Sequence, residues 1–479
     1  MFFNSIEFAV FLPTVFCLYW FCFNKSLRLQ NLLILAASYL FYGWWDWRFL
    51  SLIIFSSLID FSIGIQLAKK EIAWQRKLLL GLSISVNLGF LGFFKYFNFF
   101  TDSFAKAFTI LGNSIVDPIV LNIVLPVGIS FYTFQTLSYS IDVYQKKLEP
   151  CKDVIAFFAF VSFFPQLVAG PIERATNLLP QFYRQRNFNY SQSVDGMRQI
   201  LWGLFKKMVI ADNCAFYVND IFDNYGNYSG STLLLGAFLF ALQIYGDFSG
   251  YSDVAIGTSR LFGFGLRQNF AFPYFSRDVA EFWRRWHISL STWFRDYLYI
   301  PLGGSKGNTW MKVRNTLIIF IVSGFWHGAN WTFIIWGALN ALYFLPLLLL
   351  KRNRSNLKIV AQGKFLPSVK EIVSIIITFI LITFAWVFFR AESVNQAVYY
   401  IGRILSPSLF SLPEVFPVKI LTLVGCFLLI EWLGREQQYA IEKIERIFIK
   451  PIRWVIYYLF IIAIFSFTGQ EQEFIYFQF

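Results

Sequence analysis

Charged residues are scarce in this chain, since Asp, Glu, Lys and Arg together make up 14% of its 479 residues. A soluble domain usually carries about 25%. The chain is instead 57% hydrophobic and 21% aromatic, with a mean hydropathy of +0.54. About eleven apolar runs approach the roughly 20 residues that a membrane-crossing helix needs. The shortage of charge therefore excludes an ordinary soluble protein and predicts a membrane protein.

Patterns that bind metals or form disulfide frameworks are also missing. The five cysteines form no CxxC pair, and we expect them to be small core residues; they are Cys17, Cys22, Cys151, Cys214 and Cys426. The chain has only two histidines and no HExxH motif, whereas zinc needs three or four ligands. No metal site is predicted. GxSxG and P-loop motifs are absent as well, so a Ser-His-Asp triad has no support.

Long apolar runs decide between the two folds that can span a bilayer. Backbone polar groups in the hydrocarbon core must be satisfied within helices or within a closed barrel. The runs here are too long and continuous for the short alternating strands of a barrel. The sequence predicts an all-α fold: one membrane-embedded domain over residues 1–479, a polytopic helical bundle of roughly eleven spans. Residues 6–23 lack a basic n-region and a cleavage site, which favours a retained first span over a signal peptide.

The positive charge of the chain is explained by membrane orientation. The net charge is +13, and cytoplasmic loops of membrane proteins carry an excess of Lys and Arg. Placing the basic clusters inside puts the N-terminus and the tail, residues 470–479, outside; the clusters include Lys25 and Arg28, Lys69 and Lys70, Lys206 and Lys207, and Lys351, Arg352 and Arg354. The excess therefore does not indicate nucleic-acid binding.

Three stretches differ from plain spans. Residues 167–186 contain two prolines and mixed charge, which predicts a loop with short helical pieces. Residues 276–299 mix Trp with Arg, which predicts a helix at the membrane interface or packed in the bundle near it; an ordinary amphipathic interfacial helix explains the pattern equally well. Residues 315–350 have basic residues at both ends, so we expect the chain to enter and leave on one face.

The third stretch is predicted to break within the membrane. The break falls near Gly324, Gly328 and Asn330. A helix over residues 315–328 rises only about 21 Å, which is short of the roughly 30 Å core. Irregular backbone at that depth is tolerated only where it is buried in protein or lines a cavity. This broken hairpin therefore marks a candidate site.

The two histidines fall in two of these stretches, His287 in the Trp-Arg segment and His327 in the broken hairpin. Ionisable residues inside a membrane are rare and functional by default. Neutral imidazole accepts a proton near physiological pH, which suits a general base. We expect four other polar residues to form structural hydrogen bonds or ion pairs between helices; they are Glu173, Arg174, Asp247 and Asp253.

At these residues the chain resembles the membrane-bound O-acyltransferase family. SGFWHGANW at residues 323–331 is similar to the family's His motif, and FWRRWHISLSTW at 282–293, continuing through RDYLYIPLGG at 295–304, is similar to its second motif. Residues 166–174, 203–213 and 243–257 resemble the bacterial branch. The chain length and the ending FIYFQF at 474–479 favour the subgroup that O-acetylates alginate and other exported polysaccharides.

The resemblance implies a fold, a site and partners. The fold is a bundle with re-entrant or interfacial helices around a central tunnel, in the bacterial cytoplasmic (inner) membrane. His327 is the catalytic histidine and His287 its partner, which positions a reactant or stabilises developing charge. Acetyl-CoA is the expected donor substrate, and the acyl group passes to a polysaccharide hydroxyl or to an extracytoplasmic partner of the SGNH-hydrolase-like kind. No residues that bind the donor are identified.

Two other functions remain open from the sequence. A sibling group of the family moves D-alanine to teichoic acids and shares both histidine motifs, so the donor can instead be a carrier-protein thioester. A non-catalytic transporter of a lipid-linked sugar is the alternative of another class. Inverted repeats and paired broken helices would favour transport, and the sequence offers only one convincing broken hairpin.

Overall fold

A computed structural model describes residues 1–110, 120–168, 170–467, 472, 474 and 475. Every regular element in these residues is a helix or a helical turn, which confirms the predicted all-α class. The chain forms two compact units, residues 1–193 with 258–266 and residues 194–257 with 267–479. The predicted outer tail and the FIYFQF ending lie outside the described residues, apart from Gln472, Phe474 and Ile475.

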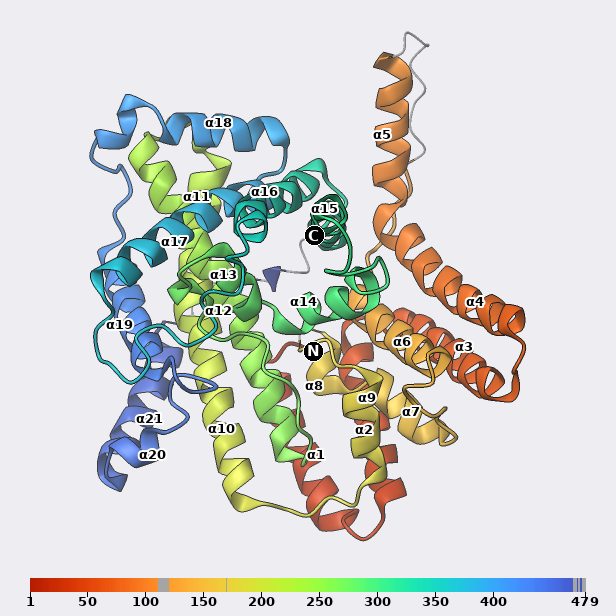
Figure 1. The fold of residues 1–479 in the computed structure, drawn as a ribbon. Coiled ribbons are helices and arrows are strands. Elements are labelled where there is room, and N and C mark those ends of the chain that lie inside the picture. Colours follow the sequence, from red (N-terminus) through yellow and green to blue (C-terminus); the bar gives the residue numbers. More distant parts are fainter. Residues whose placement is uncertain (111–119, 169, 468–471, 473, 476–479) are drawn as a thin grey trace. The chain divides into compact units, whose positions relative to one another are not determined.

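The first unit contains the N-terminal helices, drawn in red to yellow in Figure 1. Its elements are α1 (Ile6–Cys17), η1 (Leu18–Cys22), α2 (Leu27–Asp46), η2 (Trp47–Phe49), α3 (Leu50–Lys69), α4 (Ala73–Leu91), η3 (Gly92–Tyr96), α5 (Phe97–Ile110), α6 (Ile129–Tyr144), α7 (Val154–Val161), α8 (Phe164–Leu167), α9 (Ala175–Leu178), η4 (Leu179–Tyr183) and the start of α10 (Tyr190–Leu204). The short pieces α9 and η4 confirm the helical fragments predicted for residues 167–186.

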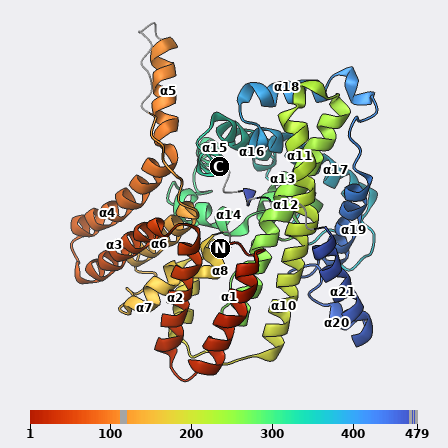
Figure 2. The same ribbon diagram turned by 180° about the vertical axis from the view of Figure 1, so that it is seen from behind.

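A buried carboxylate joins three helices of this unit. Helices α3, α4 and α6 pack side by side (Figure 1; Figure 2). Asp60 on α3 is fully buried and accepts hydrogen bonds from Asn87 on α4 and Ser140 on α6, at 2.8 and 2.7 Å. Burying a carboxylate is costly unless it is hydrogen-bonded, so these donors fix how the helices pack.

The second unit contains both histidines. Its elements are η5 (Phe205–Ala211), α11 (Asp212–Asp223), η6 (Tyr225–Asn227), α12 (Gly230–Leu261), η7 (Pro273–Phe275), α13 (Val279–Arg285), α14 (Ile288–Phe294), η8 (Arg295–Tyr299), α15 (Thr309–His327), α16 (Trp331–Leu349), α17 (Val369–Arg390), α18 (Val394–Ile404), η9 (Pro407–Phe410), α19 (Val418–Gly434), α20 (Ile444–Ile447) and α21 (Lys450–Ser466), with the rest of α10. The boundaries between the units fall within α10 and α12.

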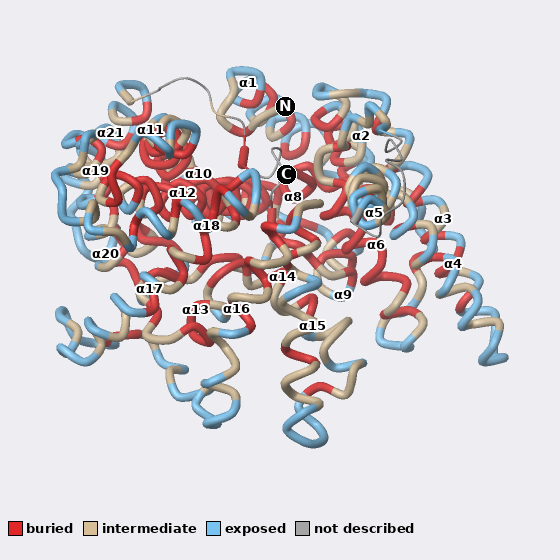
Figure 3. Tube along the Cα trace, turned by 90° about the horizontal axis from the view of Figure 1, so that it is seen from above, coloured by how far each residue is buried: buried red, intermediate tan, exposed pale blue. Residues whose placement is uncertain are grey.

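Helix α12 forms the core of this unit, and it is buried along most of its length in Figure 3. Two ion pairs join it to η5: Lys206 lies 2.6 Å from Asp253, and Lys207 lies 2.7 Å from Asp247. All four side chains are largely buried. Asp247 and Asp253 therefore have the structural role that the sequence predicted for them.

Five stretches of helix are long and apolar enough to cross a membrane, which agrees with a polytopic protein. They are Leu27–Lys69, Ala73–Thr109, Gly230–Leu261, Trp331–Leu349 and Val369–Arg390, and two shorter apolar stretches are Ile6–Cys22 and Val154–Leu167. The most apolar window of Ala73–Thr109 is only 17% buried within the protein, so its exposed leucines suit a lipid environment. The number of about eleven spans and the single domain over residues 1–479 stay predictions.

Two expectations from the sequence were wrong in detail. Residues 276–299 do not form one helix, because the chain breaks at Trp286 and His287 between α13 and α14. The cysteines are not all core residues: Cys151 and Cys214 are buried, whereas Cys17, Cys22 and Cys426 are exposed. Apolar helix faces that meet lipid accept a small hydrophobe as readily as the core does.

Candidate active site

The predicted broken hairpin is present as α15 and α16, with the break at residues 328–330. Helix α15 begins at Thr309, earlier than the expected residue 315, because Asn308 caps it. The Asn330 side chain caps α16 by accepting the backbone N–H of Thr332 at 3.1 Å. His327 is thus the last residue of α15, held where one helix stops and the next begins.

Glycine allows the two arms of the hairpin to pack closely. A Cβ at Gly324 would collide with the carbonyl oxygen of Phe333, and a Cβ at Gly337 would collide with that of Phe320. Backbone meets backbone at both points, and no side-chain rotation relieves such a collision. Small residues that let helices approach in this way are common in membrane bundles.

Aromatic rings surround His327, whose side chain is 4% exposed. The ring centroids of Trp326, Trp336 and Phe389 lie 4.9, 5.1 and 5.3 Å from the imidazole centroid. These rings come from α15, α16 and α17. Packing among three helices therefore sets the position of this imidazole, which supports the prediction that the break is buried in protein.

His287 occupies the break between α13 and α14. Its backbone is left-handed, with φ 43° and ψ 55°, a conformation that is uncommon for any residue except glycine. Strained backbone of this kind persists only where the surroundings enforce it. Here the neighbouring N–H of Ile288 donates to the Asn269 carbonyl at 2.9 Å, and Ala271 N–H donates to the Arg285 carbonyl at 2.9 Å. Segment 269–271, which is not part of any helix, thus holds the turn.

The side chain of His287 is 1% exposed and lies beside polar atoms. Its Nδ1 is 3.1 Å from Asn269 Oδ1. Burial lowers the pKa of His287 to about 3, well under its ordinary value of 6.5, because a buried site disfavours the charged form. At neutral pH this histidine is therefore uncharged.

Both histidines line one cavity of about 250 Å³. Its lining residues are Trp283, Trp286, His287, Leu290, Ser291, Phe294, Arg295, Tyr299, Ser305, Thr316, Ile319, Phe320, Ser323, His327, Phe344, Leu348, Asn353 and Arg354. Arg295, Ser305 and Arg354 are exposed, whereas the two imidazoles are buried. The cavity thus leads from a basic, polar rim to an aromatic interior that holds both histidines.

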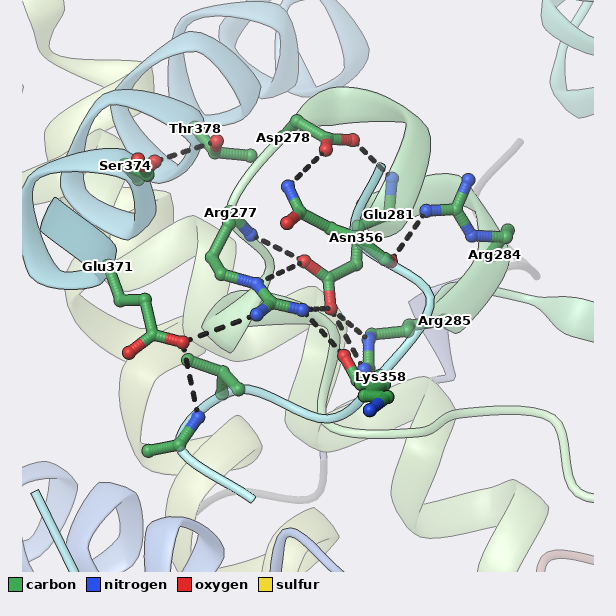
Figure 4. A network of polar contacts seen from close by, with 12 residues as sticks. Arg277, Asp278, Glu281, Arg284, Arg285, Asn356, Lys358, Glu371, Ser374 and Thr378 are labelled. Atoms are coloured by element: carbon green, nitrogen blue, oxygen red, sulfur yellow. Dashed lines mark hydrogen bonds and ion pairs between the residues drawn. The ribbon is translucent and has the colours of Figure 1, made fainter. Parts of the chain in front are cut away.

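A network of ion pairs holds α13, the helix that precedes His287 (Figure 4). Glu281 is buried and forms ion pairs with Arg277 and Arg285, at 3.0 and 2.9 Å. Arg277 also reaches Glu371 at the start of α17, at 3.2 Å. Arg284 donates to the carbonyl oxygens of residues 353 and 356, at 2.8 and 2.9 Å. The network therefore fixes the loop that carries Asn353 and Arg354 at the cavity rim.

The structure brings together the two histidines predicted as site residues, although they are 40 positions apart in the chain. Sequence reasoning missed the partners of His287, which are Asn269 and Ser289, and the rim residues Arg295 and Arg354. The i, i+4 spacing of Arg277, Glu281 and Arg285 was a readable signal for the network. Among the described residues, no group of three or more His, Cys, Asp or Glu side chains could hold a metal ion.

Comparison with known proteins identifies the family of the chain. A family model described as "MBOAT, membrane-bound O-acyltransferase family" matches residues 152–389, which include both histidines. A probable alginate O-acetylase AlgI of Pseudomonas aeruginosa is 38% identical over 92% of this chain and 82% of its own length. A peptidoglycan O-acetyltransferase of Helicobacter pylori is 35% identical, over 81% of this chain and 76% of its own.

A more distant similarity links the chain to another acyl transfer. A teichoic acid D-alanyltransferase of Bacillus subtilis is 27% identical over 57% of this chain and 70% of its own length. All of these relatives are named for enzymes that transfer an acyl group, which goes against the transporter hypothesis. The chain is an O-acyltransferase and belongs to the membrane-bound O-acyltransferase family.

Proposed function

We propose that this enzyme moves an acetyl group from acetyl-CoA to a hydroxyl of an exported polysaccharide, or to an extracytoplasmic SGNH-hydrolase-like partner that acetylates it. One observation carries the proposal: the only two histidines of the chain are both buried and line the same cavity. The names of the O-acetylating relatives support acetyl as the group that is moved. The cytoplasmic membrane of a bacterium is the location that fits this route.

In the proposed reaction His327 acts as the general base. It takes the proton of the acceptor hydroxyl while the oxygen attacks the carbonyl carbon of the thioester. A C–O bond forms, the C–S bond breaks, and the coenzyme leaves as a thiolate. The thiolate then takes the proton from the His327 imidazolium, so that the products are the ester and the free thiol. His287 positions a reactant beside this step.

The shape of the cavity supports this use. Reactants held together in a confined site gain an effective concentration far above that in solution. The interior beside His327 is formed by Trp and Phe rings, and polar contacts are stronger where water is excluded. The broken hairpin thus supplies a dry reaction chamber.

The rim of the cavity suits an anionic donor. Arg295 and Arg354 stand at the rim, on η8 and on the loop between α16 and α17. Guanidinium groups bind phosphate oxygens well because they present several donors in a fixed geometry. Arg295 is paired with Asp296 at 2.6 Å, so Arg354 is the stronger candidate. The phosphates of coenzyme A would bind here, with the thioester reaching inward.

The test is acyl transfer by the purified protein in nanodiscs with labelled acetyl-CoA, in the presence of a candidate acceptor or partner. We expect His327→Ala to lower the rate by about 10²–10⁴, the usual contribution of a general base, while the protein inserts and folds as before. His287→Ala is measured alongside as a matched change in the same cavity. Normal turnover by folded His327→Ala would disprove the proposed role.

A second candidate donor is a carrier-protein thioester of an amino acid. The similarity to teichoic acid D-alanyltransferases favours it. A donor-exchange assay separates the two: the wild-type protein is given labelled acetyl-CoA or a carrier protein loaded with labelled D-alanine. Release of label from the carrier alone would replace acetyl-CoA with the carrier thioester and leave the acyltransferase reaction in place.

A further inference from the structure

The hydrogen bonds around Asn269 identify the atoms of its side-chain amide. Its Oδ1 lies 3.2 Å from the backbone N–H of Ser289 and 2.8 Å from the Ser289 hydroxyl. A backbone N–H can only donate, so the atom facing it must be the amide oxygen. On its other side, the amide nitrogen of Asn269 donates to the Ser252 hydroxyl at 3.1 Å. Both ends of the amide have partners that agree with this orientation.

The orientation of Asn269 determines where His287 carries its proton. The amide oxygen lies 3.1 Å from His287 Nδ1, and an oxygen that can only accept requires a hydrogen on that nitrogen. The Ser289 hydroxyl is 3.4 Å from Nδ1, but it donates its hydrogen to the nearer Asn269 Oδ1 at 2.8 Å. Neutral imidazole has one N–H and one bare nitrogen, and the bond made by one nitrogen sets the state of the other. Nε2 of His287 is therefore the bare nitrogen.

That bare nitrogen is available to a reactant. Nε2 of His287 is buried, and within the described part of the chain no atom forms a hydrogen bond with it. His287 also lines the cavity that contains His327. A buried polar atom without a partner is costly, so Nε2 is able to accept a hydrogen bond from a molecule bound in the cavity.

We propose that Asn269 is a positioning residue that locks His287 in the Nδ1–H tautomer, so that Nε2 accepts a hydrogen bond from an N–H or O–H group of a bound reactant. For the reactant this inference rests on the proposed function. The resemblance left two roles for His287, which are to position a reactant and to stabilise developing charge. The Nδ1–H tautomer leaves only the first, because Nε2 then has no proton to donate to the oxyanion that forms from the thioester. That leaves oxyanion stabilisation to other groups in the cavity.

Two reactant groups have the required chemistry. The pantetheine arm of the donor carries amide N–H groups, and a polysaccharide acceptor carries hydroxyls beside the one that attacks. Both kinds of group donate hydrogen bonds, and measurements of KM for each substrate show which of them bonds to His287. Loss of the bond raises the KM for the donor thioester in the first case and the KM for the acceptor in the second.

The tautomer can be measured directly because the chain has only two histidines. The full-length protein is labelled with ¹⁵N-histidine and studied by solid-state NMR in lipid, where protonated and bare ring nitrogens have distinct shifts. His327→Gln removes one set of signals and so assigns His287. We expect His287 to show a protonated Nδ1 and a bare Nε2 in the wild-type protein.

Three variants test the role of Asn269. Asn269→Leu removes the acceptor, and we expect His287 to populate the other tautomer and one KM to rise by about tenfold, the effect of one lost hydrogen bond. Asn269→Asp keeps the accepting oxygen, and Ser252→Ala removes only the contact on the far side of the amide. Both should keep Nδ1 protonated, and they remain informative if Asn269→Leu does not fold.

The outcomes separate this inference from the proposed function. A protonated Nε2 in the wild-type protein, or an unchanged tautomer in folded Asn269→Leu, overturns the inference. A fall in kcat with both KM values unchanged also overturns it, because it would assign His287 to the chemical step. If the wild-type protein transfers no acyl group, the proposed function fails, and the NMR signals still decide the tautomer.

Discussion

His287 and His327 line the same cavity, and Trp326 packs against both imidazoles, but the backbone segments that carry the two histidines differ. His287 sits on a left-handed turn, bonded to an amide and preceded by a helix that is fixed by ion pairs. His327 ends a regular helix, and aromatic rings from three helices surround it. His287 therefore combines aromatic packing with a directional polar contact to Asn269, whereas the position of His327 follows from the end of α15 and from the rings around it.

The difference teaches which changes each side of the site should tolerate. Polar contacts fix an orientation, and they fail when a charge or an acceptor is removed. Packing fixes a position, and it fails when volume is added or a cavity is opened. Substitutions can therefore be chosen to disturb one histidine through charge and the other through volume.

The largest effect on stability is expected from Glu281, at the centre of the polar side. Glu281→Gln removes the charge that pairs with both Arg277 and Arg285. Breaking a buried pair leaves uncompensated charge, which costs on the order of 3 kcal/mol. We expect the melting temperature in detergent to fall strongly and the loop at the cavity rim to loosen.

Asp102→Asn is the matched control for this substitution. Asp102 pairs with Lys106 at the same i, i+4 spacing and at 2.7 Å, but both side chains are exposed. An exposed pair contributes about 0–1 kcal/mol. If the melting temperature fell equally in the two variants, burial would add nothing to the stability of the Glu281 ion pairs. The ion pairs would then not be what holds the segment around His287.

The packed side should respond to a single methyl group. In Gly324→Ala the new Cβ meets the Phe333 carbonyl oxygen, so α15 and α16 must separate near His327. Overpacking of this kind costs about 1–3 kcal/mol. We expect a lower melting temperature together with a loss of acyl transfer, since the imidazole at the end of α15 moves.

Gly402→Ala provides the control for added volume. Gly402 lies within α18, and a Cβ there would have no atom within 4 Å. Replacing an exposed helical glycine with alanine stabilises a helix by roughly 0.5–1 kcal/mol. If Gly324→Ala behaved like Gly402→Ala, close backbone packing would not be what positions His327.

The packed side of the site was largely predictable from sequence, whereas the polar side was not. The break at Gly328 and Asn330 follows from local signals, which are glycine and a capping residue. The helix-length argument was wrong, because α15 begins at Thr309 and has 19 residues. Asn269 contacts His287 across 18 positions, with η7 and α13 between them. No period or cap encodes such a contact, and it becomes visible only when the fold places segment 269–271 beside the turn.

The break at His287 shows the same limit. The Trp-Arg pattern of residues 276–299 predicts a helix, and helical pieces do form on both sides of the break. The left-handed turn between them is enforced by hydrogen bonds from segment 269–271, so tertiary structure overrides the local preference. The family resemblance named both histidines, but it did not assign them different environments.

The smallest expected effect is the part of the pH dependence of stability that is due to His287. Its pKa is about 3 when folded and 6.5 in the unfolded chain. Between these values the unfolded state binds a proton that the folded state does not, so stability falls as the pH falls through that window. From pH 7 to 5.5 the loss is about 1 kcal/mol.

His287→Gln provides the comparison, because glutamine does not titrate. Melting temperatures of the wild-type and variant proteins are measured between pH 7 and 5, where both retain His327 and the same carboxylates. We expect the wild-type curve to fall more steeply as the pH is lowered, because its buried imidazole resists protonation. Parallel curves would mean that protonation of His287 does not destabilise the folded protein. The polar contacts around His287 would then not require a neutral imidazole.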